Sequence, residues 1–139
     1  MKGLVWLRND LRMDDNPSLK QACIESDEVH CIYIHSSEQN ELHNEANCKI
    51  EFIIENLKNL NRSLNKFNIP LTIISSKGFS DNAEKIIETA KKRSITKVYW
   101  NNVFGADEQK RDLDVKQILE SNNIEYETFD DQVVFAPGT

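Results

Sequence analysis

The sequence is poor in glycine and contains no glycine-rich loop. Its four glycines, Gly3, Gly78, Gly105 and Gly138, lie far apart. Neither the G-x-G-x-x-G motif of dinucleotide-binding domains nor a P-loop is present, and the turn after the first apolar segment has no glycine at all. A close approach of the backbone to a pyrophosphate is therefore not expected there.

Cysteine is also scarce. The three cysteines, Cys23, Cys31 and Cys48, are widely spaced, and no C-x-x-C pair occurs. This pattern does not favour a zinc site, and it favours a disulfide framework even less, because an odd number of cysteines cannot all pair. We expect buried free thiols in a reducing cytoplasm.

Long apolar runs and an excess of positive charge are missing as well. No stretch approaches the length that spans a membrane, and the first residues show no signal-peptide cleavage pattern. The net charge is −6, which argues against binding duplex DNA through this chain alone. We expect a cytoplasmic protein that has no membrane contact and no strong nucleic-acid binding of its own.

Short apolar segments alternate with helical patterns along all 139 residues. The predicted strands are residues 3–7, 29–35, 71–75, 97–100 and 124–129, and the predicted helices are 18–26, 46–67, 81–93 and 106–121. Such alternation is typical of parallel strands joined by right-handed crossovers. The sequence therefore predicts an α/β fold with an open, doubly wound sheet and helices on both faces.

Caps and apolar spacing support the helices. Asn16 followed by Pro17 is a capping residue before proline at the first helical position. Three- and four-residue steps define the apolar face of the long helix, which comprises Ile50, Ile53, Ile54, Leu57, Leu60, Leu64 and Phe67. Ser80 can cap the next helix, whose inward positions are Ala83, Ile86, Ile87 and Ala90. Trp6 and Trp100 lie inside strands and are expected in the core.

The first strand ends abruptly in polar and charged residues. They are Arg8, Asn9, Asp10, Arg12, Asp14 and Asp15. Ligands of open parallel sheets bind beyond the carboxyl ends of the strands, where strand order reverses, so this cluster could form the floor of a crevice. The alternative is a structural ion-pair network with helix-capping carboxylates, which the spacing alone favours. The residues by themselves indicate a Rossmann-like domain that does not bind a dinucleotide in the usual manner.

Residues 4–19, "LVWLRNDLRMDDNPSL", resemble the opening of the DNA photolyase and cryptochrome family, whose pattern is W-F-R-x-D-L-R-x-x-D-N-x-x-L. The matching positions are Trp6, Arg8, Asp10, Leu11, Arg12, Asp15, Asn16 and Leu19, whereas Leu7 replaces the usual aromatic residue. The segments "VYWNNVFGADEQKRDLDV" and "FDDQVVFAPGT" resemble later parts of the same domain. The resemblance covers the whole chain in the family's order and spacing.

This resemblance implies a light-harvesting antenna domain over residues 1–130, with five parallel strands in the order 3-2-1-4-5. Residues 131–139 would begin the linker to a helical domain, absent here, that holds FAD and binds damaged DNA. The parent protein would be a deoxyribodipyrimidine photolyase, which uses light to repair cyclobutane pyrimidine dimers. We expect this chain alone to be monomeric and catalytically silent. The alternatives are the same domain of a cryptochrome photosensor or, with less support, a nucleotide-binding stress-protein module.

The antenna chromophore of the family is methenyltetrahydrofolate, a deazaflavin or FMN. The resemblance places Glu108 where folate-type members use a carboxylate to accept hydrogen bonds from the pterin ring, and Asp107 where some members have a side-chain amide. His43 stands where a folate-binding relative has a histidine, and Asn44 follows it. Without the resemblance, the two acids would be ordinary first-turn residues of a helix, and His43 a solvated surface histidine.

One departure from the family pattern bears on the choice of chromophore. Many members have a second arginine where this chain has Asn9, and that arginine can hold an anionic antenna tail. Its absence favours folate over a deazaflavin or FMN. Arg8 is assigned to the crevice beside Asn9, and with Asp10 and Arg12 it is expected to support the crevice floor. No catalytic and no metal-binding residue is expected.

Overall fold

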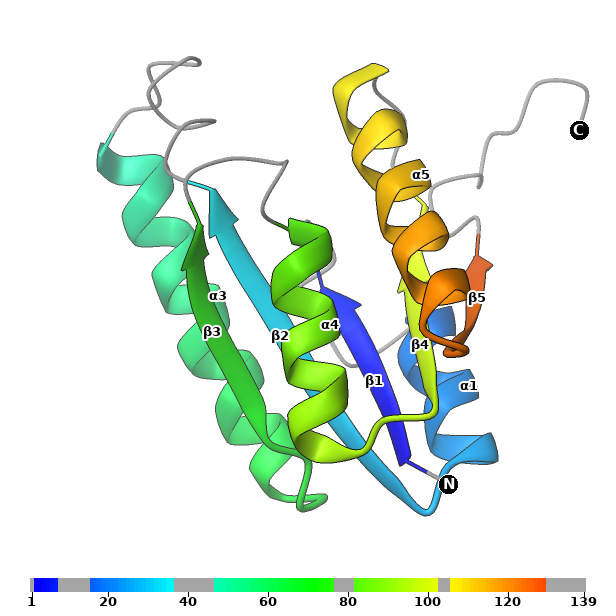
Figure 1. The fold of residues 1–139 in the computed structure, drawn as a ribbon. Coiled ribbons are helices and arrows are strands. Elements are labelled where there is room, and N and C mark those ends of the chain that lie inside the picture. Colours follow the sequence, from blue (N-terminus) through cyan, green and yellow to red (C-terminus); the bar gives the residue numbers. More distant parts are fainter. Residues whose placement is uncertain (1, 8–15, 37–46, 77–81, 103–105, 130–139) are drawn as a thin grey trace, which may run out of the picture.

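The computed structural model describes residues 2–7, 16–36, 47–76, 82–102 and 106–129, with only the backbone for 36, 47–53, 75–76 and 106–108. Five parallel strands form one sheet in the order β3-β2-β1-β4-β5 (Figure 1). The strands are β1 (Lys2–Leu7), β2 (Glu28–Ser36), β3 (Leu71–Ser76), β4 (Lys97–Asn101) and β5 (Glu125–Phe129). The predicted fold class and strand order are confirmed.

Helices cover both faces of the sheet, as the alternating pattern predicts (Figure 1). They are α1 (Pro17–Glu25), α3 (Asn47–Asn65), α4 (Asn82–Arg93) and α5 (Ala106–Ser121). Buried residues of α1 and α3 pack with one side of the sheet, and buried residues of α4 and α5 pack with the other. Within the described ranges, no helix is both long and apolar enough to cross a membrane.

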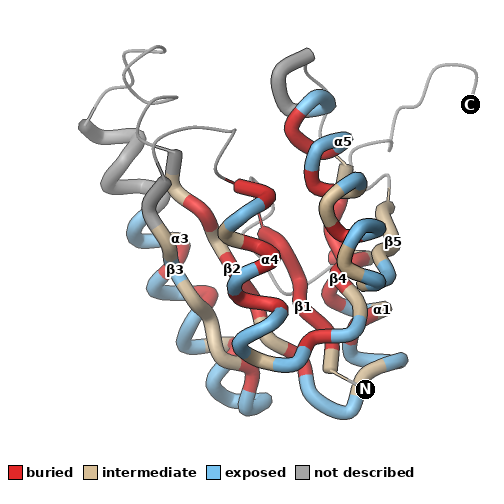
Figure 2. Tube along the Cα trace, in the orientation of Figure 1, coloured by how far each residue is buried: buried red, intermediate tan, exposed pale blue. Residues whose placement is uncertain are grey.

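The central strand β1 is buried along nearly its whole length (Figure 2). Leu4 and Trp6 pack in the core that α4 and α5 cover, whereas Val5 and Leu7 pack on the α1 and α3 side. A strand covered on both faces needs a continuous apolar run, and this explains why the segment does not alternate with polar residues. Trp100 of β4 is equally buried, so the expectation that both tryptophans belong to the core is confirmed.

Three helix-to-strand turns use the same backbone geometry without glycine. Their left-handed residues are Asn68, Ser94 and Asn123, with φ angles of 59°, 58° and 58°. Each is followed by an isoleucine whose N–H donates to the carbonyl five positions earlier: Ile69 to Leu64, Ile95 to Ala90 and Ile124 to Leu119. This is the helix-ending Schellman arrangement, in which an apolar residue packs back against the helix.

Most predicted helix faces are correct, but the long helix differs at two positions. Leu57, Leu60 and Leu64 are buried, whereas Ile54 is 45% exposed and Phe67 is 65% exposed. Phe67 lies beyond the end of α3, where helical spacing no longer applies, and Ile54 lies at the margin of the buried stripe. Ile50 and Ile53 have side chains outside the described part, and Ser80, the predicted cap of α4, lies outside it altogether.

The expectation of buried thiols is confirmed for Cys31 and wrong for Cys23, which is exposed. Cys23 directly follows the buried Ala22 on α1, and one residue turns a helix by about 100°, so its side chain is directed away from the sheet. The side chain of Cys48 lies outside the described residues.

Candidate functional site

The carboxyl ends of β1 and β4 lie side by side, with Trp6 opposite Trp100 in the register. The chain passes from β1 to α1 on one face of the sheet and from β4 to α5 on the other (Figure 1). This is the point at which strand order reverses and at which ligands of open α/β sheets bind. We therefore take the carboxyl ends of β1 and β4, with the starts of α1 and α5, as the candidate site.

On the α1 side, the candidate site contains a buried cluster of Asn16, Ser18 and Asn101, called the asparagine cluster below. The three residues are 2%, 0% and 3% exposed. Asn16 is the N-cap of α1, with Pro17 following, as predicted; its Oδ1 accepts from Leu19 N at 3.3 Å and from Ser18 Oγ at 2.9 Å. Asn101 Nδ2 donates to the same oxygen at 2.7 Å, and Asn101 Oδ1 accepts from Ser18 N at 3.1 Å.

On the α5 side, Arg111 and Asp112 are both buried. Arg111 Nε donates to Asp112 Oδ1 at 3.4 Å, and the guanidinium carbon lies 5.0 Å from the centroid of a Trp6 ring. A cation over an aromatic face is attracted by the ring's quadrupole, whose negative side faces it, more strongly when water is excluded. The contact between Arg111 and Trp6 joins the first half of α5 to the carboxyl half of β1.

The predicted acids Asp107 and Glu108 lie in the first turn of α5, although their side chains are outside the described part. Asp107 is four positions before Arg111, and Glu108 is four positions before Asp112. Residues four apart share a helix face, so both acids lie on the face that carries the buried pair, one turn nearer the helix start. The described backbone thus places the two positions beyond the end of β4. Arg8, Asn9, His43 and Asn44 lie outside the described residues and stay predictions.

Charged groups gather at the opposite, amino end of the sheet. Lys97 Nζ donates to Glu25 Oε1 at 3.0 Å and to Glu127 Oε1 at 2.9 Å, and Tyr99 OH donates to Glu25 Oε1 at 2.7 Å. The hydrogen bonds from Tyr99 and Lys97 hold the pKa of Glu25 below its usual value. Burial and then the hydrogen bond to Glu25 raise the pKa of Tyr99 to about 12. This network joins the end of α1 to β4 and β5.

A second polar group at the amino end surrounds His30. Its Nδ1 lies 3.4 Å from Arg93 Nη1, and its Nε2 lies 3.9 Å from Glu28 Oε2. Arg93 also donates to Thr72 Oγ1 at 3.4 Å, which ties the end of α4 to β3. Burial, followed by the charge of Arg93, lowers the pKa of His30 below its usual 6.5.

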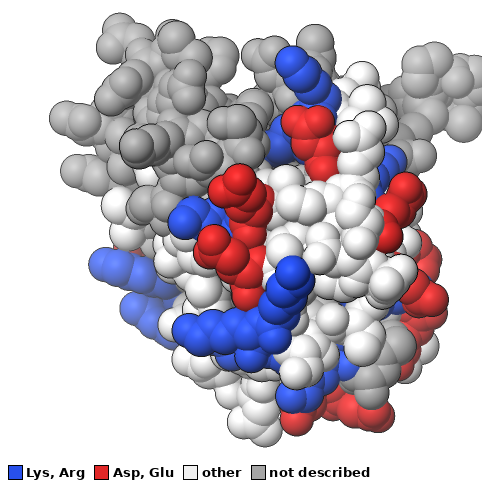
Figure 3. Space-filling model, viewed as in Figure 1, with Lys and Arg blue, Asp and Glu red and all other residues white. Residues whose placement is uncertain are grey.

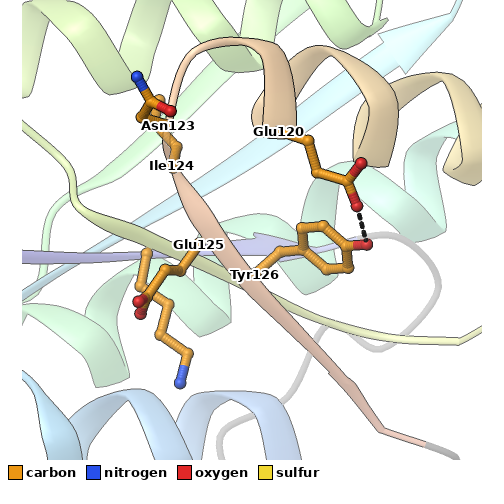
Figure 4. A pocket seen from close by; sticks show the side chains of 6 residues that line it. Glu120, Asn123, Ile124, Glu125 and Tyr126 are labelled. Carbon is orange, nitrogen blue, oxygen red and sulfur yellow. Dashed lines mark hydrogen bonds between the residues drawn. The ribbon is translucent and has the colours of Figure 1, made fainter.

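A shallow hollow of about 450 Å³ lies near the start of β5, far from the candidate site (Figure 4). It is lined by Lys97, Glu120, Asn123, Ile124, Glu125 and Tyr126. Glu120 and Tyr126 point toward one another and share a 2.8 Å hydrogen bond, whereas Glu125 points away from them (Figure 4). The polar side chains that line the hollow do not converge on a common point. Among the described residues, no three potential metal ligands come together either.

The sequence identified Asn16 as a helix cap but missed its bond to Asn101. In the sequence, Asn101 belongs to the segment "VYWNNVFGADEQKRDLDV", which resembles a family motif. The two residues are 85 positions apart, and their contact depends on β4 lying beside β1. A polar residue at the end of an otherwise apolar strand was the available signal.

The strand order, the helices on both faces and the polar groups at the ends of β1 and β4 define the class of Rossmann-like, doubly wound α/β domains. A family model described as DNA photolyase matches residues 3–139. The chain belongs to the DNA photolyase family, which confirms the resemblance read from its motifs.

Two curated relatives and one solved structure illustrate this membership. The chain is 35% identical to the deoxyribodipyrimidine photo-lyase of Vibrio cholerae, over 98% of this chain and 29% of that protein. It is 26% identical to cryptochrome-1 of Sinapis alba, over 99% of this chain and 26% of that protein. The crystal structure of an archaeal photolyase from Sulfolobus tokodaii matches with a TM-score of 0.76 and 26% identity, over 93% of this chain and 29% of that one. The chain thus spans less than a third of the length of these relatives.

Proposed function

We propose that this chain is the light-harvesting antenna domain of a deoxyribodipyrimidine photolyase, which repairs cyclobutane pyrimidine dimers in DNA with light. The observation that carries the proposal is the 35% identity with a protein of that name over 98% of this chain, compared with 26% for a plant cryptochrome. Residues 1–130 would form the antenna domain, and residues 131–139 would lead to a helical domain that binds FAD and damaged DNA.

The chromophore proposed for this domain is methenyltetrahydrofolate. Glu108 and Asp107 would accept hydrogen bonds from ring N–H groups, a task suited to carboxylates because each offers two acceptor oxygens. The position of both acids in the first turn of α5, on the same face as Arg111 and Asp112, supports this role. His43, Asn44, Asn9 and Arg8 would complete the pocket. The chromophore would supply absorption of near-ultraviolet light, which the chain's own side chains lack.

A related photolyase supports a light-harvesting role in this family. The Sulfolobus tokodaii photolyase is described with two FAD molecules and with the implication of a novel light-harvesting cofactor. For this chain, a flavin or deazaflavin in place of folate is the alternative chromophore. Release of the bound chromophores from the purified full-length protein and their chromatographic separation distinguish the three, because folate and deazaflavin absorb at different wavelengths from flavins, and FMN separates from FAD.

Glu108→Gln in the full-length protein tests the folate site. The variant keeps the side-chain shape but removes the negative charge, and hydrogen bonds to charged groups contribute about 1.5–3 kcal/mol. We expect folate to bind roughly ten to a hundred times more weakly. Lys110→Gln, at an exposed position two residues further along α5, is the matched control and should bind normally. Equal folate affinity of Glu108→Gln and wild type would remove Glu108 from the site.

Illumination of ultraviolet-damaged DNA in the presence of the protein distinguishes a photolyase from a cryptochrome. The full-length protein with reduced FAD should repair dimers under blue light, and this chain alone should not. The acidic balance supports the second expectation, since the net charge is −6 and, on the face of α4 and α5, described basic side chains lie beside acidic ones (Figure 3). Absence of repair by the full-length protein would favour a photosensor.

A further inference from the structure

Asn101 ends β4 inside the candidate site and is almost fully buried. Both ends of its side-chain amide are engaged, because Oδ1 accepts from Ser18 N and Nδ2 donates to Asn16 Oδ1. These partners come 83 and 85 residues earlier in the chain. One side chain thus connects the end of β4 to the start of α1 through two directional bonds.

The core does not require an asparagine at this position, and the helix cap uses only its oxygen. Asn16 Oδ1 accepts from Leu19 N and Ser18 Oγ, and Asn101 Oδ1 supplies the acceptor for the buried Ser18 N, so the bond from Asn101 Nδ2 to Asn16 is not needed by the cap. Leu7, at the end of the neighbouring strand β1, is apolar and equally buried. Burying an amide carries a desolvation cost that an apolar side chain avoids. What Asn101 adds is a fixed geometry between two segments rather than additional apolar burial.

Both connected positions belong to the candidate site, because Asn16 caps α1, which follows β1, and Asn101 is the last residue of β4, which precedes α5. We propose that Asn101 is a positioning residue for the chromophore site. By holding the end of β4 against the start of α1, it fixes the spacing between the strand end and the helix start that border the proposed ligand. This inference rests on the proposed antenna function.

Substituting aspartate for Asn101 tests the positioning role, because aspartate has the same size and shape as asparagine. Asn101→Asp keeps an acceptor for Ser18 N but removes the Nδ2 donor and places a carboxylate against Asn16 Oδ1. Rotating the Asn16 amide to donate instead would withdraw its oxygen from Leu19 N and Ser18 Oγ. Asn122→Asp is the matched control, because Asn122 Nδ2 donates to Ile118 O at 2.7 Å and the same substitution removes a donor at the amino end of the sheet, away from the candidate site.

The first measurement is amide hydrogen exchange in the full-length protein without added folate. We expect the N–H groups of Ser18, Leu19 and Asn102 to exchange at least about tenfold faster in Asn101→Asp than in Asn122→Asp or wild type. Exchange of the Ile95 N–H, at the amino end of the sheet, should stay unchanged. Uniform acceleration through the domain, or none near Asn101, would overturn the positioning role, because the effect would then be global or absent.

The second measurement is titration with methenyltetrahydrofolate. We expect the dissociation constant to rise about tenfold in Asn101→Asp, because a misaligned site loses preorganisation, and to stay within about twofold in Asn122→Asp. Ile95→Val, a conservative core variant at the amino end, controls for general loss of stability. Faster local exchange with unchanged folate affinity would overturn the proposal. If wild type binds no folate, the folate assignment fails, and the same titration with a deazaflavin and with FMN tests the positioning role. If wild type binds none of the three, the positioning role fails together with the antenna function.

Discussion

The two ends of the sheet are held together by different kinds of contact. At the amino end, Lys97 joins Glu25 and Glu127, and its partners are 31% and 38% exposed. At the carboxyl end, the asparagine cluster is neutral and nearly inaccessible to water. Screening by salt and by water weakens the first kind of contact, whereas the second depends on each donor keeping its acceptor.

This difference indicates where the domain tolerates change. Partly exposed ion pairs contribute modestly and can be lost without leaving a buried charge. A buried amide without its partner costs more, because water cannot replace the lost hydrogen bond. We therefore expect substitutions at the carboxyl end, where the ligand is proposed to bind, to destabilise the domain more than substitutions at the amino end. The contribution of the amino end to stability should depend more on pH and salt.

The largest expected effect comes from Asn16→Ala. This change removes the helix cap and leaves Ser18 Oγ and Asn101 Nδ2 without their acceptor, so we expect the free energy of unfolding to fall by about 3 kcal/mol. Urea denaturation at low and at high salt measures the effect, which should not depend on salt. A loss below about 0.5 kcal/mol, typical of an exposed surface change, would contradict the conclusion that the buried carboxyl end is the more sensitive end of the sheet.

Lys97→Met should have a smaller effect that depends on salt. The change leaves Glu25 and Glu127 without their shared cation, and the partial exposure of both carboxylates keeps the loss of unfolding free energy well below that of Asn16→Ala. Urea denaturation should show that the difference in unfolding free energy between Lys97→Met and wild type decreases as salt is added. Lys92→Met, at an exposed position of α4, is the control. A loss that does not change with salt would mean that packing of the lysine stem, rather than charge, holds this end.

Ser94→Gly should stabilise the amino end. Ser94 has a φ of 58°, a conformation that costs a residue with a side chain about 1–2 kcal/mol. Glycine relieves this cost but adds freedom to the unfolded chain, so we expect a net gain of about 0.5–1 kcal/mol. Asn68→Gly should gain less, because asparagine tolerates this conformation. Thermal denaturation compares the two, and equal gains would contradict the assignment of the strain to the serine side chain.

The smallest effect is expected from His30. Its pKa is lowered in the folded protein, so above pH 6.5 the histidine is neutral in both states and its contribution is complete. As the pH falls from 6.5 through the folded pKa, the unfolded chain takes up the proton first, and the free energy of unfolding decreases. His30→Gln should remove this part of the pH dependence. Identical profiles for the two proteins would show that His30 does not contribute.

The fold could be predicted because its signals are local. The apolar run of β1 and the spacing of Ile86, Ile87 and Ala90 in α4 indicate strand and helix without knowledge of their neighbours. The prediction that Ile54 is buried failed because this residue lies at the margin of the buried face of α3, where a small rotation of the helix decides whether a side chain is exposed. Ser94 gives no signal for its left-handed backbone, since serine has no preference for that conformation.

The candidate site was only partly predictable, for a different reason. Asn16 is readable as a cap from Asn-Pro, but its bond to Asn101 exists only once β4 has paired with β1. No periodicity links residues 85 positions apart. The prediction that Glu108 binds the chromophore depends on the family motif, and it stays a prediction.

The central position of β1 also has a consequence for the order of folding during synthesis. β1 is made before the other four described strands, and its partner β4 follows about 90 residues later. At typical translation rates of about 5–20 residues per second, one edge of this apolar strand would remain unpaired for roughly 5–20 s. Unpaired apolar edges invite association with other chains. The newly made chain therefore passes through an interval in which a chaperone that covers residues 2–7 would most increase its yield.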